Sequence, residues 1–459
     1  MRSARLETID LPDFGVPREM PVLSPRLYAG RLERLRARMS AEGYQRLVFY
    51  ADREHSANLA WLSGFDPRFE EAVLIVGPDG EPLLLAGNEC VGMGRAAPLP
   101  MRVELWQDLS LPGQPRDRSR PLVDILSDEG VRTGVMVGVV GWKPFADPSW
   151  LEVPSYLADA LRTAVGPTGH VANTNDLLID PATGLRAVNE VEQLAAFEYA
   201  ACHTSEGVKR LLFGLRPGMT EQQAVELLGW TGAPLSCHLM LSSGARANLG
   251  LLSPSDRIIE HGERFTTAFG VWGALDCRAG FVVASASELA DSIADYVERL
   301  VAPYFEAVVA WLEALHVGQT GGTLQAIIDE RLGDPFFGIF LNPGHLIGLD
   351  EWVHSPVYPD SPVELRSGMA MQVDIIPATG GEYFTTNIEG GLALADERLR
   401  RDLAVRYPTA WSRITARRAF MGDTLGVALH PDVLPFSNLP AYLAPFLLAP
   451  KRALVMRPG

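Results

Sequence analysis

Two kinds of hydrophobic pattern alternate along the chain. In one, apolar residues recur every three or four positions among charged residues, which is typical of a helix with one buried face. In the other, a short run is apolar throughout and ends at glycine or proline, which is typical of a buried strand. In the first part of the chain the helical pattern covers residues 25–43 and 154–165, and the strand pattern covers residues 45–51, 71–77 and 131–141.

The Pro-Asp-Gly step in GPDGEPLLLAG predicts a hairpin turn into one more strand of this first part. Strands and helices therefore mix within a single region, which predicts an α/β domain over residues 1–185. The turn-rich stretch DPATGL, residues 180–185, indicates where this domain ends.

The second part of the chain, residues 186–459, shows the same two patterns. A long helix is expected from Val188 to about Gly214, and Thr220 and Gln223 have the spacing of a capping box at the start of the next helix. Strand-like, glycine-rich segments follow from 236 to 286 and from 366 to 394, with a long helical segment between them. We therefore expect a second α/β domain and an overall α/β (α+β) fold class.

The charge and cysteine content of the chain limit the classes of partner and the cellular compartment that we expect for it. The 459 residues include 40 basic and 56 acidic side chains, so the formal net charge is −16. Such a surface repels phosphate backbones and anionic lipids, and we expect neither nucleic acid nor a membrane as a partner. The four cysteines form no Cys-x-x-Cys pair, and no leader or long apolar segment is recognisable. These features predict a protein of the reducing cytoplasm, without a zinc knuckle or disulfide framework.

Five segments of the second part occur in a recognisable order: RPGMTEQQAVELL, SSGARANLGLLSPSDRIIEHGERF, GHLIGL, LRSGMAMQVDIIP and TTNIEGGLAL. This order resembles the C-terminal domain of the creatinase, prolidase and aminopeptidase P family, known as the pita-bread fold. The stretch YADREHSANLAWLSGF and the strands after it resemble the N-terminal domain of that family. The resemblance implies a pita-bread domain over residues 186–459, a creatinase-like domain before it, and a homodimer.

The metallopeptidases of this family hold two divalent ions with two aspartates on a hairpin, one histidine and two glutamates. The resemblance places His345 at the histidine position and Glu389 at the last glutamate position. Asp374 stands where the family has its other glutamate, which keeps the oxygen donor but shortens its reach.

The hairpin departs from the family pattern. Ala268 takes the place of the first aspartate, and the second falls on Ala279 or on Leu275, depending on the alignment, with Asp276 one place further on. Because side chains alternate between the faces of a strand, Asp276 should point away from the site unless a bulge re-aims it. We therefore expect no two-metal centre. One ion of Mn, Zn, Fe or Co on His345, Asp374 and Glu389, or no metal at all, stays open.

Without a metal, the chemistry would rest on histidines and carboxylates, as in creatinase. The position of the creatinase catalytic histidine is Leu252 here, and the neighbouring His238 is either a base or an ordinary strand residue. His345 is either a site residue or a buried imidazole in a glycine-rich turn. His354 resembles the second histidine of the family, although the interval from His345 is longer here.

Two carboxylates provide the acid and base of the metal-free alternative. Asp374 and Glu389 in proximity would raise the pKa of one of them and form a general acid and base pair. An unpaired charge at Asp374, inside the apolar run MAMQVDIIP, would be costly, so this carboxylate needs a partner.

Substrate contacts are expected from four side chains. Phe65 and Arg68 lie in a loop that reaches the partner's active site in creatinase-like dimers, where an arginine would suit a substrate carboxylate; the alternative is a solvated turn. His238 and Arg278 are the other two, and Arg278 could instead form an ion pair with Asp276.

These residues lead to two functional hypotheses. The first is a hydrolase of a C–N bond (amide, imide or amidine) in a small amino-acid-like or Xaa-Pro-type substrate, with His345, His354, Asp374 and Glu389 as catalytic residues. The second is a catalytically silent homologue that binds a small molecule or a protein partner through the same cleft. The missing aspartates argue against an ordinary Xaa-Pro aminopeptidase.

Overall fold

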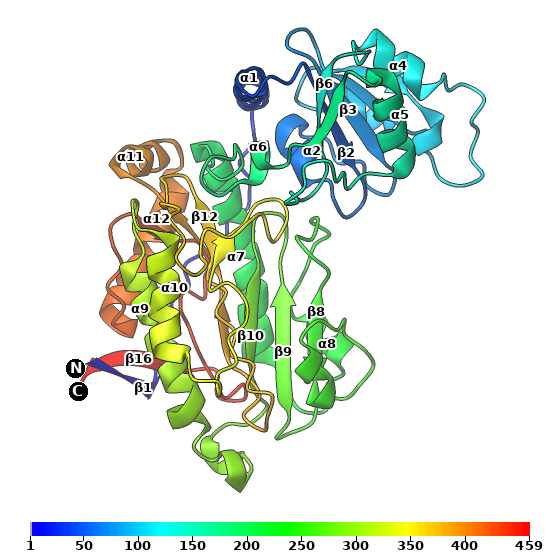
Figure 1. Cartoon of the computed structure of the whole chain (residues 1–459). Helices are drawn as coiled ribbons and strands as arrows, with labels where there is room; N and C mark the ends of the chain where they lie inside the picture. Colours follow the sequence, from blue (N-terminus) through cyan, green and yellow to red (C-terminus); the bar gives the residue numbers. More distant parts are fainter. Residues whose placement is uncertain (1) are drawn as a thin grey trace. The chain divides into compact units, whose positions relative to one another are not determined.

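The computed structural model of the protein describes residues 2–459, and the chain forms two compact units. One unit consists of residues 23–187, and the other combines the chain up to Val22 with Val188–Gly459 (Figure 1). Both units mix helices and strands, so the predicted α/β class is confirmed.

The first unit is built on a six-stranded sheet with the strand order β5-β4-β3-β2-β6-β7. β2 runs antiparallel to β3 and parallel to β6, and β3 and β4 form the predicted hairpin. The strands are β2 (Arg46–Ala51), β3 (Ala72–Val76), β4 (Leu83–Ala86), β5 (Arg102–Leu105), β6 (Met136–Val140) and β7 (His170–Asn173). The helices are α1 (Pro25–Ala41), α2 (Ala57–Ser63), α3 (Val91–Arg95), α4 (Leu122–Asp128), α5 (Ser155–Val165) and α6 (Asp176–Ile179).

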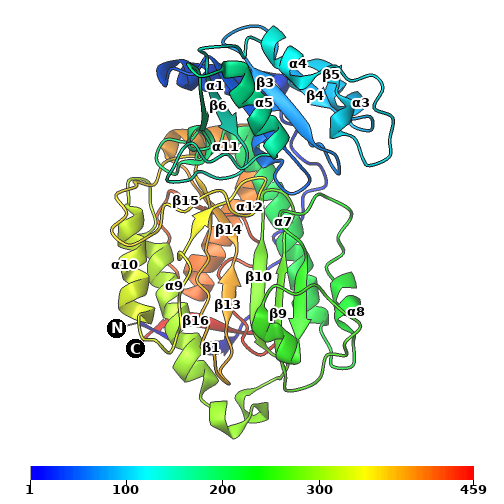
Figure 2. The same cartoon turned by 45° about the vertical axis from the view of Figure 1, so that its right-hand side comes forward.

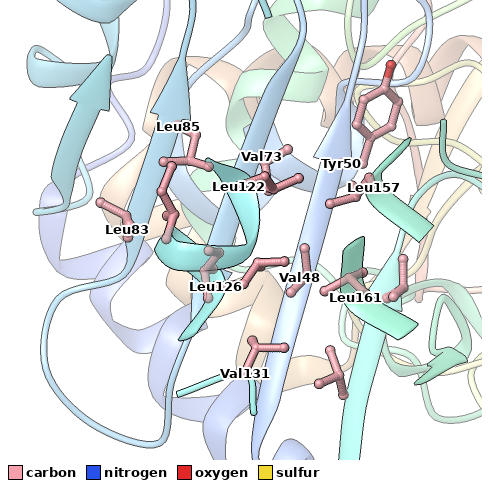
Figure 3. Close-up of a cluster of buried hydrophobic side chains, with 14 of the residues drawn as sticks. Val48, Tyr50, Val73, Leu83, Leu85, Leu122, Leu126, Val131, Leu157 and Leu161 are labelled. Carbon is pink, nitrogen blue, oxygen red and sulfur yellow. The ribbon is translucent and has the colours of Figure 1, made fainter. Parts of the chain in front are cut away.

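Helices α4 and α5 cover one face of this sheet. Val48 on β2 and Val73 on β3 pack against Leu126 of α4 and Leu161 of α5, and all four are fully buried (Figure 3). On the strands these side chains alternate with residues that point to the opposite face, as the period of two requires. Apolar burial of this extent is the main force that holds the unit together.

The second unit contains two four-stranded sheets, with the orders β13-β10-β9-β8 and β11-β12-β14-β15. Its strands, apart from the terminal pair, are β8 (Met240–Ser243), β9 (Arg264–Phe269), β10 (Asp276–Phe281), β11 (His345–Leu346), β12 (Ala370–Gln372), β13 (Asn387–Glu389), β14 (Gly391–Leu394) and β15 (Val433–Pro435). The only residue between β13 and β14 is Gly390, so one continuous segment contributes a strand to each sheet. In Figures 1 and 2 the strands lie between α9 and α10 on one side and α8 on the other.

Six α-helices belong to the described residues of the second unit. They are α7 (Val191–Gly214), α8 (Glu221–Glu226), α9 (Ala302–Ala314), α10 (Gly321–Leu332), α11 (Glu397–Arg406) and α12 (Pro408–Ala419). α7 is the long helix expected from Val188, and α8 begins with the predicted capping box of Thr220 and Gln223. None of the helices within residues 2–459 is both long and apolar enough to cross a membrane.

The start of the chain differs from the expectation. β1 (Arg2–Thr8) pairs along its whole length with β16 (Arg452–Pro458), so these residues belong to the second unit and not to the first domain in which the sequence placed them. The pairing joins strands at opposite ends of the chain. No local hydrophobic pattern of residues 2–8 could indicate such a distant partner.

Candidate functional site

The first component of the site is the His345 imidazole, which is completely buried on β11. The preceding Gly344 has a φ of 129°, and a Cβ there would lie 2.8 Å from the Trp311 ring, so a glycine is needed to bring the backbone in. Nδ1 of His345 lies 3.1 Å from the carbonyl oxygen of Leu346. Because a carbonyl only accepts, Nδ1 carries the proton and Nε2 faces the site.

A neighbouring loop, residues 347–353, supplies two side chains that cover the imidazole. We call this segment the Glu351 loop. Oε1 of Glu351 lies 3.1 Å from Nε2 of His345. Trp352 stacks on the imidazole, with ring centroids 4.1 Å apart and an interplanar angle of 16°. The loop thus fixes the plane of the ring and puts a carboxylate at its free nitrogen.

Asp374 and Glu389 bring two more carboxylates to the same place. Oδ2 of Asp374 lies 3.9 Å from Nε2 of His345, and Asp374 is 5% exposed. Glu389 ends β13 and is 3% exposed, with its Oε1 3.3 Å from the donating Nε2 of Gln372. One ring nitrogen of His345 and one carboxylate oxygen each of Glu351 and Glu389 lie within 4.8 Å of one another.

The shared burial changes the proton affinities of these groups. Desolvation raises the pKa of Asp374 to about 6, although the charge of His345 acts in the opposite direction. Desolvation, reinforced by the charges of Asp374 and Glu351, raises the pKa of Glu389 well above its usual range. Burial alone would lower the pKa of His345, but Glu351 raises it on balance. The group can therefore retain a proton at neutral pH and pass it between its members.

The β9–β10 hairpin contributes no carboxylate to this group. Its register puts Cys277 opposite both Ala268 and Glu389, and neither Ala279 nor Leu275, the two alternatives for the second aspartate position, carries a carboxylate. The Cys277 thiol hydrogen-bonds with Glu389, and burial raises its pKa well above the usual range. The hairpin therefore presents a methyl group and a protonated thiol to the site.

Asp276 and Arg278 point to the other face of β10, as strand alternation predicts. Nη1 of Arg278 lies 2.8 Å from Oδ1 of Asp276, and Ser437 donates a hydrogen bond to Oδ2. The guanidinium also donates to the carbonyl oxygens of Cys277, Glu389 and Leu439. With Arg278 only 3% exposed, its donors serve the interior of the protein, and the expected contact with substrate finds no support in this arrangement.

The other two histidines considered as site residues lie differently. His354 is opposite Leu346 in an isolated β-bridge, with Nδ1 3.2 Å from the carbonyl oxygen of Ser355. His238 is exposed, and its Nε2 lies 2.9 Å from the Leu251 carbonyl oxygen. Within residues 2–459 neither imidazole makes a hydrogen bond or ion pair with the three carboxylates.

Phe65 and Arg68 belong to the first unit. Phe65 is 2% exposed and is part of the interior of that unit. Arg68 is exposed, with a φ of 61° in the left-handed region and its guanidinium 3.4 Å from Asp66. Of this pair, Arg68 is the one with an accessible side chain.

Sequence reasoning did not find Glu351, Cys277 or Gln372. The signal for Glu351 was the long interval between His345 and His354, because the extra length of that loop carries the acidic residue. Cys277 faces the site because of the register of the hairpin, and this register cannot be determined from the residue pattern alone. Gln372 lies opposite His345 in the β11–β12 pair and donates to Glu389 and to the Leu275 carbonyl oxygen.

The donor set fits one divalent ion and not two. Two dications need several anionic ligands, and the hairpin residues next to Glu389 are Ala268 and Cys277, neither of which is a carboxylate. One imidazole nitrogen with the carboxylates of Glu351, Asp374 and Glu389 is a suitable set for a single Mn, Fe, Co or Zn ion.

Comparison with known proteins agrees with this architecture. Residues 31–169 match the family model of the Creatinase/Prolidase N-terminal domain. An "Uncharacterized peptidase YqhT" of Bacillus subtilis is 24% identical over 212 residues, which cover 43% of this chain and 58% of that protein. The chain thus aligns with little more than half the length of this curated relative.

Solved structures share the fold over most of the chain. The Xaa-Pro dipeptidase from Bacillus anthracis has a TM-score of 0.61 at 16% identity, covering 81% of this chain and 96% of its own. The X-Pro aminopeptidase from Thermotoga maritima gives 0.61 at 18% identity, with coverages of 80% and 95%. The prolidase from Pyrococcus furiosus gives 0.59 at 17% identity, with 79% and 96%. The chain thus carries a region that matches the Creatinase/Prolidase N-terminal domain, and it shares the pita-bread fold of these peptidases.

Proposed function

We propose that the protein is a hydrolase of a C–N bond in a small amino-acid-like or short-peptide substrate, and that it works without the two-metal centre of its relatives. The observation that carries this proposal is the convergence of one imidazole and three carboxylates, from Glu351, Asp374 and Glu389, in a buried site of the pita-bread fold. The relatives with this fold are named as dipeptidases, aminopeptidases and prolidases, which supports a peptidase-type hydrolase.

Hydrolysis of a C–N bond needs a base that takes a proton from water and an acid that protonates the leaving nitrogen. In the metal-free site, burial keeps the pKa of Glu389 high, so this carboxyl group can hold a proton for donation. Asp374, with a pKa of about 6, is mostly ionised at neutral pH and can accept one. A divalent ion in the site would polarise the scissile carbonyl group and activate the water.

The function is tested with purified protein and a panel of Xaa-Pro dipeptides, longer peptides with proline in second place, and guanidino and cyclic amidine compounds. We expect turnover of at least one class, and a loss of roughly 100-fold or more in kcat for Glu389→Gln. Glu382→Gln, which changes an exposed carboxylate of the same unit, is the matched control and should keep the wild-type rate.

A different outcome favours the second hypothesis. If the wild-type protein turns over no compound of the panel, with and without added divalent ions, the chain is a silent homologue that binds through its cleft. Cleavage specific for proline with two ions per chain would contradict the loss of the two-metal centre. The homodimer and the cytoplasmic location remain predictions, which gel filtration with light scattering and cell fractionation can test.

A further inference from the structure

The Glu351 loop does more than cover His345. Its carboxylate reaches Nε2 of the imidazole at 3.1 Å, yet this contact does not have the direction of a hydrogen bond. Nδ1 carries the ring proton, because its partner is the carbonyl oxygen of Leu346. The lone pair of a neutral Nε2 would then face the oxygens of Glu351 and Asp374, so a cation belongs between them: either a second ring proton, which the raised pKa of His345 favours, or a metal ion.

Other acceptors around this point also lack partners. Within residues 2–459, Oδ1 of Asp374 and Oε1 of Gln372 are buried and accept no hydrogen bond. Buried carboxylates and amides are normally satisfied, since an unpaired one raises the free energy of the folded state. The nearby cationic side chain, Arg278, pairs with Asp276 and donates to three backbone carbonyl oxygens on the other face of β10. The protein's own groups therefore leave a surplus of negative charge and of acceptor atoms.

We infer that this site binds a single divalent transition-metal ion, and that Glu351 is one of its ligands beside His345 and Glu389. Glu351 thereby supplies, from a loop, an anionic oxygen that Ala268 and Cys277 do not supply from the hairpin. Asp374, whose Oδ2 is 3.9 Å from Nε2, completes the carboxylates around the ion.

The geometry of the loop suits this role. Trp352 stacks on the imidazole and fixes its plane, and the Leu346 carbonyl oxygen fixes its tautomer, so that Nε2 is the coordinating atom. Gln372 donates to Glu389 and so orients that carboxylate. These supporting contacts are of the kind that hold metal ligands in place in other proteins.

The test measures metal binding without substrate, so its result does not depend on the proposed hydrolase activity. The full chain is freed of metal with a chelator and dialysed against Zn²⁺ or Co²⁺, and bound metal is measured by elemental analysis together with the thermal unfolding midpoint. We expect one ion per wild-type chain and a higher midpoint in its presence. In Glu351→Gln, which keeps the shape but removes the charge, binding should weaken by about ten-fold or more.

Two further variants make the result decisive. Glu382→Gln, an exposed carboxylate of the same unit, should bind the ion like the wild type. Glu351→Asp keeps the charge with a shorter reach and should bind the ion with an affinity between those of the wild type and Glu351→Gln. If Glu351→Gln fails to fold in the metal-free state, the affinity of Glu351→Asp tests whether Glu351 is a ligand. No ion or two ions per wild-type chain, or unchanged affinity in folded Glu351→Gln, would overturn the inference. Turnover without metal binding would leave the hydrolase standing and remove only the metal site.

Discussion

The β9–β10 hairpin and the Glu351 loop approach the same buried imidazole but carry opposite kinds of residue. The hairpin turns Ala268 and the thiol of Cys277 toward the carboxylates, and its own acid, Asp276, is on the other face with Arg278. The loop, which is irregular and carries two acidic residues, places Glu351 3.1 Å from His345.

This difference shows that a strand and a loop position a carboxylate in different ways. In a strand the side-chain direction is fixed by alternation, so an acid one residue out of register is lost to the site. Side chains in a loop do not have to alternate between two faces, so a small change in loop length can place a carboxylate next to a histidine. Asp276 illustrates the first case and Glu351 the second.

The largest effect should come from the hairpin's hidden ion pair. Arg278→Met would remove the partner of buried Asp276 and the donors of three carbonyl oxygens. Breaking a buried pair from one side costs about 3–5 kcal/mol, so we expect the free energy of unfolding to fall by that amount in urea titrations. The control is Arg264→Met on the neighbouring strand β9. Because the guanidinium of Arg264 is partly exposed, this change should lower the free energy of unfolding by less than about 1 kcal/mol. Equal costs would mean that Arg278 has no special structural role and is available to substrate.

Most of the fold follows from local patterns. The period of the apolar residues predicted α1, the long helix α7 and the central strands of the first unit, and the capping box of Thr220 and Gln223 is present. The pairing of β1 with β16 could not be predicted, because it depends on residues more than 400 positions apart.

The site was only partly predictable. His345, Asp374 and Glu389 lie together where the order of motifs placed them, because each motif is anchored to its own strand or strand end. The position of Cys277 depends on the register of a hairpin, which the residue pattern does not determine. Glu351 depends on the path of an irregular loop, for which hydrophobic periodicity gives no information.

The second largest effect is the pH dependence of the stability contributed by Asp276, which lies on the face of the hairpin away from the site. Burial raises the pKa of Asp276 to about 6, although Arg278 and Ser437 act to lower it. The unfolded chain has a pKa near about 4 for this group, so the folded protein binds the proton more tightly. The contribution of Asp276 to stability is therefore largest at low pH and is lost as the pH rises through about 6.

The variant Asp276→Asn has no titratable group at this position. The difference in free energy of unfolding between the wild type and this variant therefore gives the pH-dependent contribution of Asp276. Between pH 7.5 and 5 the free energy of unfolding of the wild type should gain about 1 kcal/mol relative to that of the variant, measured by urea unfolding at each pH. The carboxylates of the site titrate in both proteins and cancel in the comparison. A difference independent of pH would mean that Arg278 keeps Asp276 ionised throughout this range.

The smallest effect concerns the loop and isolates the contact between Trp352 and His345. Stacked rings 4.1 Å apart should contribute about 0.5–1 kcal/mol beyond the area they bury. In a double-mutant cycle, Trp352→Leu and His345→Leu should therefore show a coupling energy of that size, measured in the metal-free protein so that ion binding does not enter. Trp230, which is 52% exposed, provides the control: Trp230→Leu with His345→Leu should show no coupling. If the Trp352 cycle also gave no coupling, the loop would not hold the imidazole, and Glu351 would have to reach Nε2 without the support of its neighbour.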